Sequence, residues 1–137
     1  MNSTVRNILS VIGALIIGGI INVGIIKIGP NIFPAPEGVD PNDIESIKAN
    51  VHLYSAKHFI IPLVAHAAGT LAGAYAVSRL AVSNYKNLAL IIGGVFFLGG
   101  IMMAFMLPEF WKFSVLDLII AYFPMAILGW TLANKPT

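Results

Sequence analysis

The chain has no cysteine and very little charge, and both shortages narrow what it can be. Without cysteine it forms no disulfide, no thiol redox centre, no covalent c-type haem link and no cysteine-ligated iron–sulfur cluster. Only 10% of its residues are charged, against about a quarter in an ordinary soluble domain. With so few charges and 58% hydrophobic residues, the chain cannot keep its surface in water. We therefore expect lipid to cover most of it.

The charge that is present does not favour a nucleic acid as the partner. The net charge is +2, and the lysines and arginines stand singly along the chain. Surfaces that bind nucleic acids instead gather basic side chains into a patch or stripe. At 137 residues the chain is long enough for one bundle, so we expect a single transmembrane domain over residues 1–137.

Four apolar runs predict four transmembrane helices. Each is about twenty residues long, the length of helix that crosses the hydrocarbon core of a bilayer. They cover residues 8–29, 58–80, 87–107 and 113–133. The first run follows Arg6 as a signal peptide would, but it is too long for one and no A-x-A-like site follows, which indicates an uncleaved membrane helix. The predicted fold class is all-α: a polytopic membrane protein with a four-helix bundle.

The first loop, residues 30–57, is the one long connection, and it carries a predicted amphipathic helix. The pair Gly29-Pro30 is expected to end the first span, and a proline-rich linker follows. Asp40 as N-cap and Pro41 at the first helical position predict a helix over 41–57. Apolar side chains continue at helical spacing, at Ile44, Ile47, Val51 and Tyr54. This helix either lies on the membrane surface, the simpler interpretation, or runs on into the second span.

The second span presents a broad face of small residues, which predicts a place in the middle of the bundle. The face comprises Ala65, Ala68, Gly69, Ala72, Gly73 and Ala76. Small residues let helix backbones approach closely in lipid. Pro62 predicts a kink near the start of this span. The third span has two glycine pairs and no ionisable residue and is interpreted as packing structure, whereas the fourth contains Asp117 and Pro124.

An even number of spans places both termini on the same side of the membrane. Lysine and arginine are almost equally divided between the two sides. The side with the termini has no acidic residue, and its short loop lies between Arg79 and Lys86. Because basic loops stay in the cytoplasm, we expect a multi-pass protein of a bacterial inner membrane with both termini cytoplasmic.

The candidate binding residues fall in the half of the membrane opposite the termini. Helical depth, at about 1.5 Å per residue, places five of them there: Asn22, Lys27, His58, His66 and Asp117. The candidates in the loops and at the rim are Glu37, Asp40 and Glu109. Simpler roles exist for several of them. An interhelical hydrogen bond would explain Asn22. Solvation at the membrane interface would explain Lys27, His58 and Glu109.

Asp117 is the strongest candidate of this set. A carboxylate inside a span must find a partner, lose its charge or line a wet cavity. The available partners are Lys27, His58 and His66. A contact between His66 and Asp117 would form a protonatable pair that titrates as one unit. The alternative for His66 is a neutral histidine bonded to a backbone carbonyl.

We expect no metal, no cofactor and no catalytic residue. His58 and His66 stand more than two helical turns apart, so their rings would meet at one ion only through a kink at Pro62. Haem held by two histidines is disfavoured because all three histidines, His52 included, belong to one run of the chain. The sequence also contains no recognisable catalytic motif.

Two resemblances extend this interpretation. The segment Phe33–Asp40, together with His58-Phe59, Pro62, His66 and Gly69-Thr70, resembles uncharacterised small four-helix membrane proteins of bacteria. That resemblance extends over most of the chain and implies no activity. The number and length of the spans are similar to those of the small multidrug resistance transporters. Those transporters use a glutamate in the first span, where this chain has Asn22 and Lys27, so only the architecture is implied.

Three functions are consistent with these features. The first is a pocket that faces outward beneath residues 30–57, is lined by Asn22, His58, His66 and Asp117, and binds or moves a small solute, ion or proton. The second is a non-catalytic accessory subunit, with the glycine-rich faces and the loop helix as surfaces for a homodimer or a larger membrane complex. The third is a membrane enzyme that uses His66 and Asp117 as acid and base.

Overall fold

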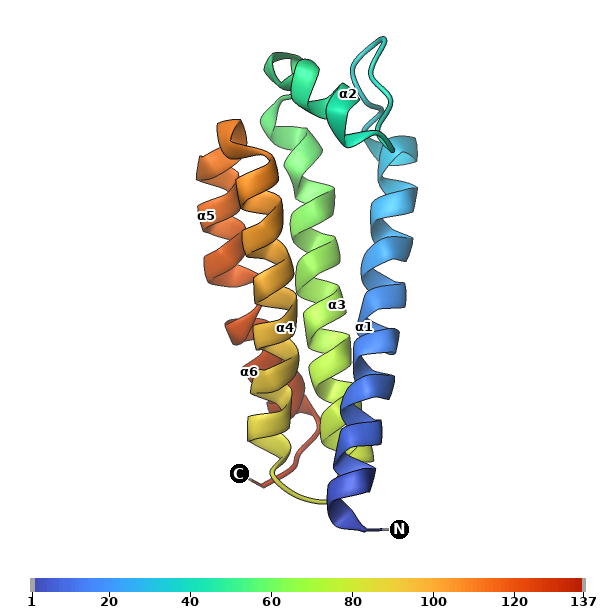
Figure 1. Cartoon of the computed structure of the whole chain (residues 1–137), viewed down its shortest axis with the longest axis vertical. Coiled ribbons are helices and arrows are strands. Elements are labelled where there is room, and N and C mark those ends of the chain that lie inside the picture. The colour runs from blue at the N-terminus through green and yellow to red at the C-terminus, as the bar shows by residue number, and fades with distance from the viewer. Residues whose placement is uncertain (1, 137) are drawn as a thin grey trace.

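The computed structural model describes residues 2–136, and every regular element in that range is a helix (Figure 1). Four helical stretches are long and apolar enough to cross a membrane: Ser3–Ile32, Ala56–Leu80, Tyr85–Met106 and Pro108–Leu132. They form a bundle with both termini at one end and the loop containing α2 at the other (Figure 1). The all-helical prediction is confirmed, and the four stretches suggest a multi-pass membrane protein.

The outer surface of the bundle is apolar, which is the arrangement expected of a protein surrounded by lipid. Large side chains such as Ile20, Leu98 and Phe105 are exposed, the last to 81%. The interior is built from smaller residues, including Ala14, Ala74 and Ala126. Soluble proteins rarely expose apolar patches of this extent, because water makes them costly. Small interior residues also let membrane helices approach closely.

Helix α1 (Ser3–Ile32) is longer than predicted. It begins at Asn2, whose side chain accepts a hydrogen bond from the Thr4 amide at 3.0 Å. The prediction that Gly29-Pro30 ends the first span was wrong, because the helix continues through the proline to Ile32. A proline this near the end removes one hydrogen bond without breaking the remaining turn. The helix ends where the Phe33 amide donates to the Gly29 carbonyl at 2.8 Å.

The predicted helix over 41–57 was also wrong in its extent. The loop contains the short helix α2 (Ile44–Ala49) and two 3-10 turns, η1 (Val51–Leu53) and η2 (Ala56–Phe59). The N-cap is Asp43 instead of Asp40, and its carboxylate accepts from the Glu45 amide at 3.1 Å. The helix ends at Asn50, a position where the side-chain amide bonds back to the Ser46 carbonyl at 2.9 Å. The side chain of an asparagine competes with the backbone hydrogen bonds of a helix in this way. The helical spacing of the apolar residues gives no sign of that competition.

Helix α3 (Ile60–Leu80) lies at the centre, as its small-residue face predicted (Figure 1). It packs against α1, α4 (Tyr85–Met106) and α6 (Phe123–Leu132). It comes close to α1 at Gly18 and Gly69. A Cβ atom added at Gly18 would lie 2.5 Å from the Gly69 carbonyl oxygen. Pro62 falls in the first turn of α3, directly after the 3-10 turn η2, where its missing N–H removes no helical hydrogen bond.

Helix α4 (Tyr85–Met106) leads through the 3-10 turn η3 (Pro108–Phe110) to α5 (Trp111–Ile120) and α6 (Phe123–Leu132). The fourth span, predicted as one helix over 113–133, is therefore two helices (Figure 1).

The break in the fourth span is caused by Pro124. Its ring would clash with the carbonyl of Ile120 in a continuous helix, and it has no N–H to donate. The chain leaves helical geometry just before it, at Tyr122, where φ is −117° and ψ is −83°. The break is what gives Tyr122 its place in the site described next.

Candidate functional site

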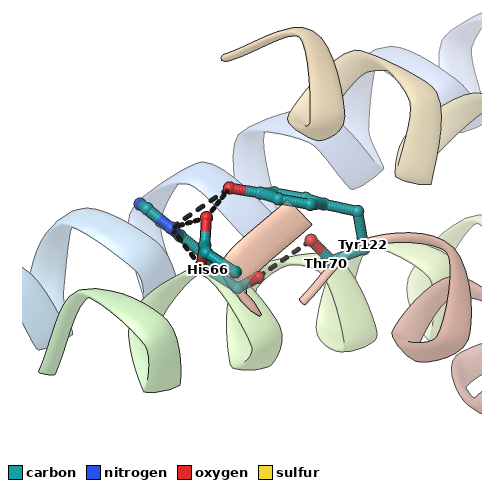
Figure 2. A network of polar contacts seen from close by, with 4 residues as sticks. His66, Thr70 and Tyr122 are labelled. Atoms are coloured by element: carbon teal, nitrogen blue, oxygen red, sulfur yellow. Dashed lines mark hydrogen bonds and ion pairs between the residues drawn. The ribbon is translucent and has the colours of Figure 1, made fainter. Parts of the chain in front are cut away.

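Three side chains from separate helical elements meet inside the bundle. The Nδ1 atom of His66 on α3 lies 2.9 Å and 3.0 Å from the two carboxylate oxygens of Asp117 on α5. The hydroxyl of Tyr122, at the break between α5 and α6, donates to Asp117 Oδ2 at 2.6 Å and lies 3.1 Å from His66 Nδ1 (Figure 2). The side chains of His66 and Asp117 are 17% and 15% exposed, and Tyr122 is buried.

The local structure holds each member of this network in place. Because the span breaks at Tyr122, its ring leaves the helical path and lies beside the His66 ring, with centroids 5.9 Å apart and the ring planes inclined by 29° (Figure 2). Thr70, one turn after His66, is fully buried and donates to the His66 carbonyl at 2.8 Å. Gly100 on α4 leaves the space that the tyrosine ring fills, since an added Cβ would lie 2.7 Å from Tyr122 Cζ.

The pairing with Asp117 determines what the other edge of the His66 ring can do. An ionised carboxylate only accepts hydrogen bonds, so the proton of a neutral His66 must sit on Nδ1. Its Nε2 atom then carries a lone pair, and it becomes a donor when the ring takes up a second proton. A carboxylate that orients a histidine in this way leaves Nε2 as a base or an acceptor.

Two cavities adjoin His66. The larger, about 340 Å³, lies beneath the loop and is lined by residues of α1, α3, α4 and the loop itself, including Tyr54, His58 and His66. The smaller, about 130 Å³, lies between α3, α4 and α5 and is lined by His66, Ser114 and Asp117. Both are walled mainly by apolar side chains, and they share Phe59, Pro62, His66, Met103, Leu107 and Phe110. His66 is therefore the polar residue common to the two cavities.

The predicted pocket is thus only partly formed by the residues expected to line it. His58 lines the larger cavity, but both nitrogens of its ring form hydrogen bonds to backbone groups of the loop. The Ser55 amide donates to Nδ1 at 3.0 Å, and Nε2 lies 3.1 Å from the Pro34 carbonyl, to which it donates. Asn22 lines neither cavity. It packs against Gly69, and its buried side-chain oxygen has no hydrogen-bond partner within residues 2–136.

The remaining candidates lie away from the network. Lys27 is exposed on α1, and Glu37 and Glu109 are exposed in the loop and in η3. Asp40 is exposed as well, and its carboxylate accepts from the Asn42 amide at 2.9 Å, a turn-forming role. Within the part of the chain that the structure describes, no three His, Cys, Asp or Glu side chains gather where they could hold a metal ion.

Sequence reasoning missed two residues of the site, Tyr122 and Thr70. Tyr122 falls inside the single helix predicted over 113–133, although Pro124, two positions later, signals a break in that part of the helix. Thr70 stands one helical turn after His66, a spacing that lets a hydroxyl bond to the carbonyl four residues earlier. Both signals were present in the sequence, but neither identifies the partner without the fold.

The space beside Gly100 makes a direct test of how Tyr122 is held. Gly100→Ala should push the tyrosine ring away and break its hydrogen bond to Asp117, because the new Cβ would overlap the phenol. The measurement is the ¹³Cζ chemical shift of Tyr122, which reports hydrogen bonding of the hydroxyl. Gly99→Ala is the matched control, since nothing lies within 4 Å of a Cβ there. An unchanged Tyr122 signal in Gly100→Ala would contradict this role.

Comparison with known proteins adds no relative to this picture: no protein-family model, no curated protein and no solved structure matches the chain. The two resemblances drawn from the sequence therefore stay predictions. What the chain does must be argued from the His66 network and the cavities beside it.

Proposed function

We propose that this protein moves protons, with or without a small solute bound beside them, at the site formed by His66, Asp117 and Tyr122. The observation that carries the proposal is the short contact of 2.9 Å between His66 Nδ1 and Asp117, on helices that meet inside an apolar bundle. Ionisable groups are costly within a membrane and usually mark a pathway for a substrate, ion or proton. Here two such groups lie together at the wall of a cavity.

The chemistry of the network favours a proton over a metal or other inorganic ion. Histidine changes its charge near neutral pH more readily than any other side chain, and the Asp117 carboxylate lies within hydrogen-bond distance of the His66 ring. Tyr122 bridges the two, so the three side chains form one connected hydrogen-bonded unit. Among the described residues that line the two cavities, Asp117 is the single carboxylate, which is too few ligands for a bare cation.

The test is proton movement in liposomes of purified lipid that hold the purified protein. A potassium diffusion potential, negative inside, is imposed, and a pH-sensitive dye trapped in the lumen reports acidification. The wild type should acidify the lumen faster than protein-free liposomes. His66→Phe should reduce the rate to that of the protein-free control, because it has no ring nitrogen. Equal rates in wild type and protein-free liposomes would argue against the proposal.

A second candidate function is that of a subunit in a homodimer or a larger membrane complex. It is favoured by glycines on the outer faces of α1 and α4: Gly13, Gly19, Gly24, Gly94 and Gly99, none of which has an atom within 4 Å of an added Cβ. Small residues on a lipid-facing helix allow close packing of another helix. Extraction in a mild detergent distinguishes the two, since a stoichiometric larger complex would favour the subunit role.

For location, we propose a bacterial inner membrane with both termini in the cytoplasm. The absence of cysteine makes single-cysteine variants a clean test. Asn2→Cys at the start of α1 and Glu37→Cys in the loop lie at opposite ends of the bundle, and both positions are exposed. In intact cells, a membrane-impermeant maleimide should label Glu37→Cys and not Asn2→Cys. The reverse pattern would invert the proposed orientation.

A further inference from the structure

We propose that the larger cavity, beneath the loop, binds a neutral amphiphile: a small apolar molecule with a hydroxyl head that donates to Nε2 of His66. This inference rests on the site of the proposed function and names its ligand class. Three features of the cavity support it: the apolar lining, the Nε2 atom of His66, and the unpaired hydroxyl of Tyr54 near the loop.

The lining selects against charged and strongly hydrated molecules. The cavity of about 340 Å³ is walled by aromatic and aliphatic side chains, with Phe33, Phe59 and Phe110 around it. Of the residues that line it, none is an aspartate, glutamate, lysine or arginine. A charged ligand would lose its hydration there without gaining a counter-charge. An apolar body gains from the same transfer.

The free edge of His66 supplies one polar contact. Its Nδ1 atom contacts Asp117 and the Tyr122 hydroxyl, which leaves Nε2 with a lone pair in the neutral ring. An alcohol or phenol donates to such a lone pair, whereas an ether or a hydrocarbon does not. His66 stands eight residues below His58, a depth of about 12 Å along a helix. The head of the ligand would therefore be its deepest part.

Tyr54 supplies the second contact, near the loop. Its hydroxyl is buried and has no hydrogen-bond partner within residues 2–136, and Tyr54 lines the same cavity. Buried hydroxyls are almost always paired in folded proteins, so an unpaired one calls for a partner. Burial raises the pKa of Tyr54, so its hydroxyl keeps its proton and stays a donor at neutral pH. An ether or carbonyl oxygen on the side of the ligand's ring opposite the hydroxyl would accept from it.

These requirements specify a probe, 4-butoxyphenol, with butoxybenzene as the matched compound that lacks the hydroxyl. Binding is followed in lipid nanodiscs by the ¹³C-methyl signals of the methionines. Met103 lines the cavity and is 42% exposed, whereas its neighbour Met102, 66% exposed, lines neither cavity. The phenol should shift the Met103 signal saturably and bind about five- to tenfold more tightly than butoxybenzene, the worth of one hydrogen bond. A shift confined to Met102 would indicate partition into lipid only and would overturn the proposal.

Two alanines distinguish the two cavities. Ala35 lines the larger cavity alone and Ala104 the smaller one alone. Ala35→Leu should abolish binding of 4-butoxyphenol, whereas Ala104→Leu should preserve it. The opposite pattern would assign the ligand to the smaller cavity and overturn the assignment made here.

Variants of the two polar residues complete the test. Tyr54→Phe, which removes a single oxygen, should weaken both compounds by a similar factor, because both retain the ether. His66→Phe should erase the preference for the phenol. Equal binding of the two compounds to the wild type would overturn the hydroxyl contact. Proton movement in liposomes, measured without probe, separates this outcome from failure of the proposed function, because it does not depend on the ligand class.

Discussion

Asp117→Asn should abolish proton movement through the protein while the bundle still folds. Asparagine has the same shape but carries no charge, so it removes the carboxylate that pairs with His66. Its amide group also replaces one of the two acceptor oxygens by a donor, so the side chain can no longer accept from His66 Nδ1 and Tyr122 through two oxygens. The measurement is the rate of lumenal acidification in liposomes under an imposed potential, and it should fall to that of protein-free liposomes.

The loss of a hydrogen bond to a charged group costs about 1–3 kcal/mol of stability, so the variant should remain helical. Its folding is checked by circular dichroism and by elution from size-exclusion chromatography. Glu109→Gln is the matched control, because it makes the same chemical change on an exposed carboxylate in η3. The control should keep the wild-type rate. Proton movement at the wild-type rate in a folded Asp117→Asn protein would sink the proposed role of the network.

Gly18→Val should be the most destabilising single change in α1. The new Cβ would lie 2.5 Å from the Gly69 carbonyl oxygen and 2.9 Å from the Phe96 ring. The carbonyl belongs to the backbone of α3 and cannot rotate away, so the two helices must separate. Overpacking of this kind costs about 3 kcal/mol. The free energy of unfolding in mixed micelles, titrated with sodium dodecyl sulfate, measures the loss.

Gly19→Val provides the comparison within the same turn of the helix. Nothing lies within 4 Å of a Cβ at Gly19, so its side chain would project into lipid. Both variants exchange glycine for valine in mid-helix, and the difference between them isolates the contact with α3. We expect Gly19→Val to change the free energy of unfolding by less than about 1 kcal/mol. Equal destabilisation by the two variants would contradict the close crossing of α1 and α3.

The fold was predictable where one physical rule decides the outcome. Long apolar runs with few charges must be helical in lipid, because the hydrocarbon core offers no partner for backbone polar groups. Small residues on α3 indicated its central position for the same reason that Gly18 and Gly69 meet there. Prediction failed at two prolines, where the tendency of proline to end a helix competes with the tendency of an apolar segment to stay helical. Pro30 was expected to end the first span but stands within α1. Pro124 was expected within one continuous helix but breaks the fourth span.

The site was predictable in part. His66 and Asp117 could be recognised individually, because an ionisable residue within a span needs a partner. Their depth placed both in the same half of the membrane, but Asn22, Lys27 and His58 met the same criterion. Depth along a helix says nothing of the direction in which a side chain points. Only the packing of α1 against α3 shows that Asn22 faces Gly69 and lines neither cavity.

The sequence by itself determined that this protein has four apolar helical stretches, few charges and an aspartate that requires a partner inside the bundle. Those properties follow from composition and from spacing along the chain, because a lipid environment constrains each segment whatever the other segments do. The tertiary structure alone decided that the partner is His66, that Tyr122 joins the pair, and that two cavities adjoin the histidine. These depend on how helices rotate and cross, and that is settled by packing between residues distant in the chain.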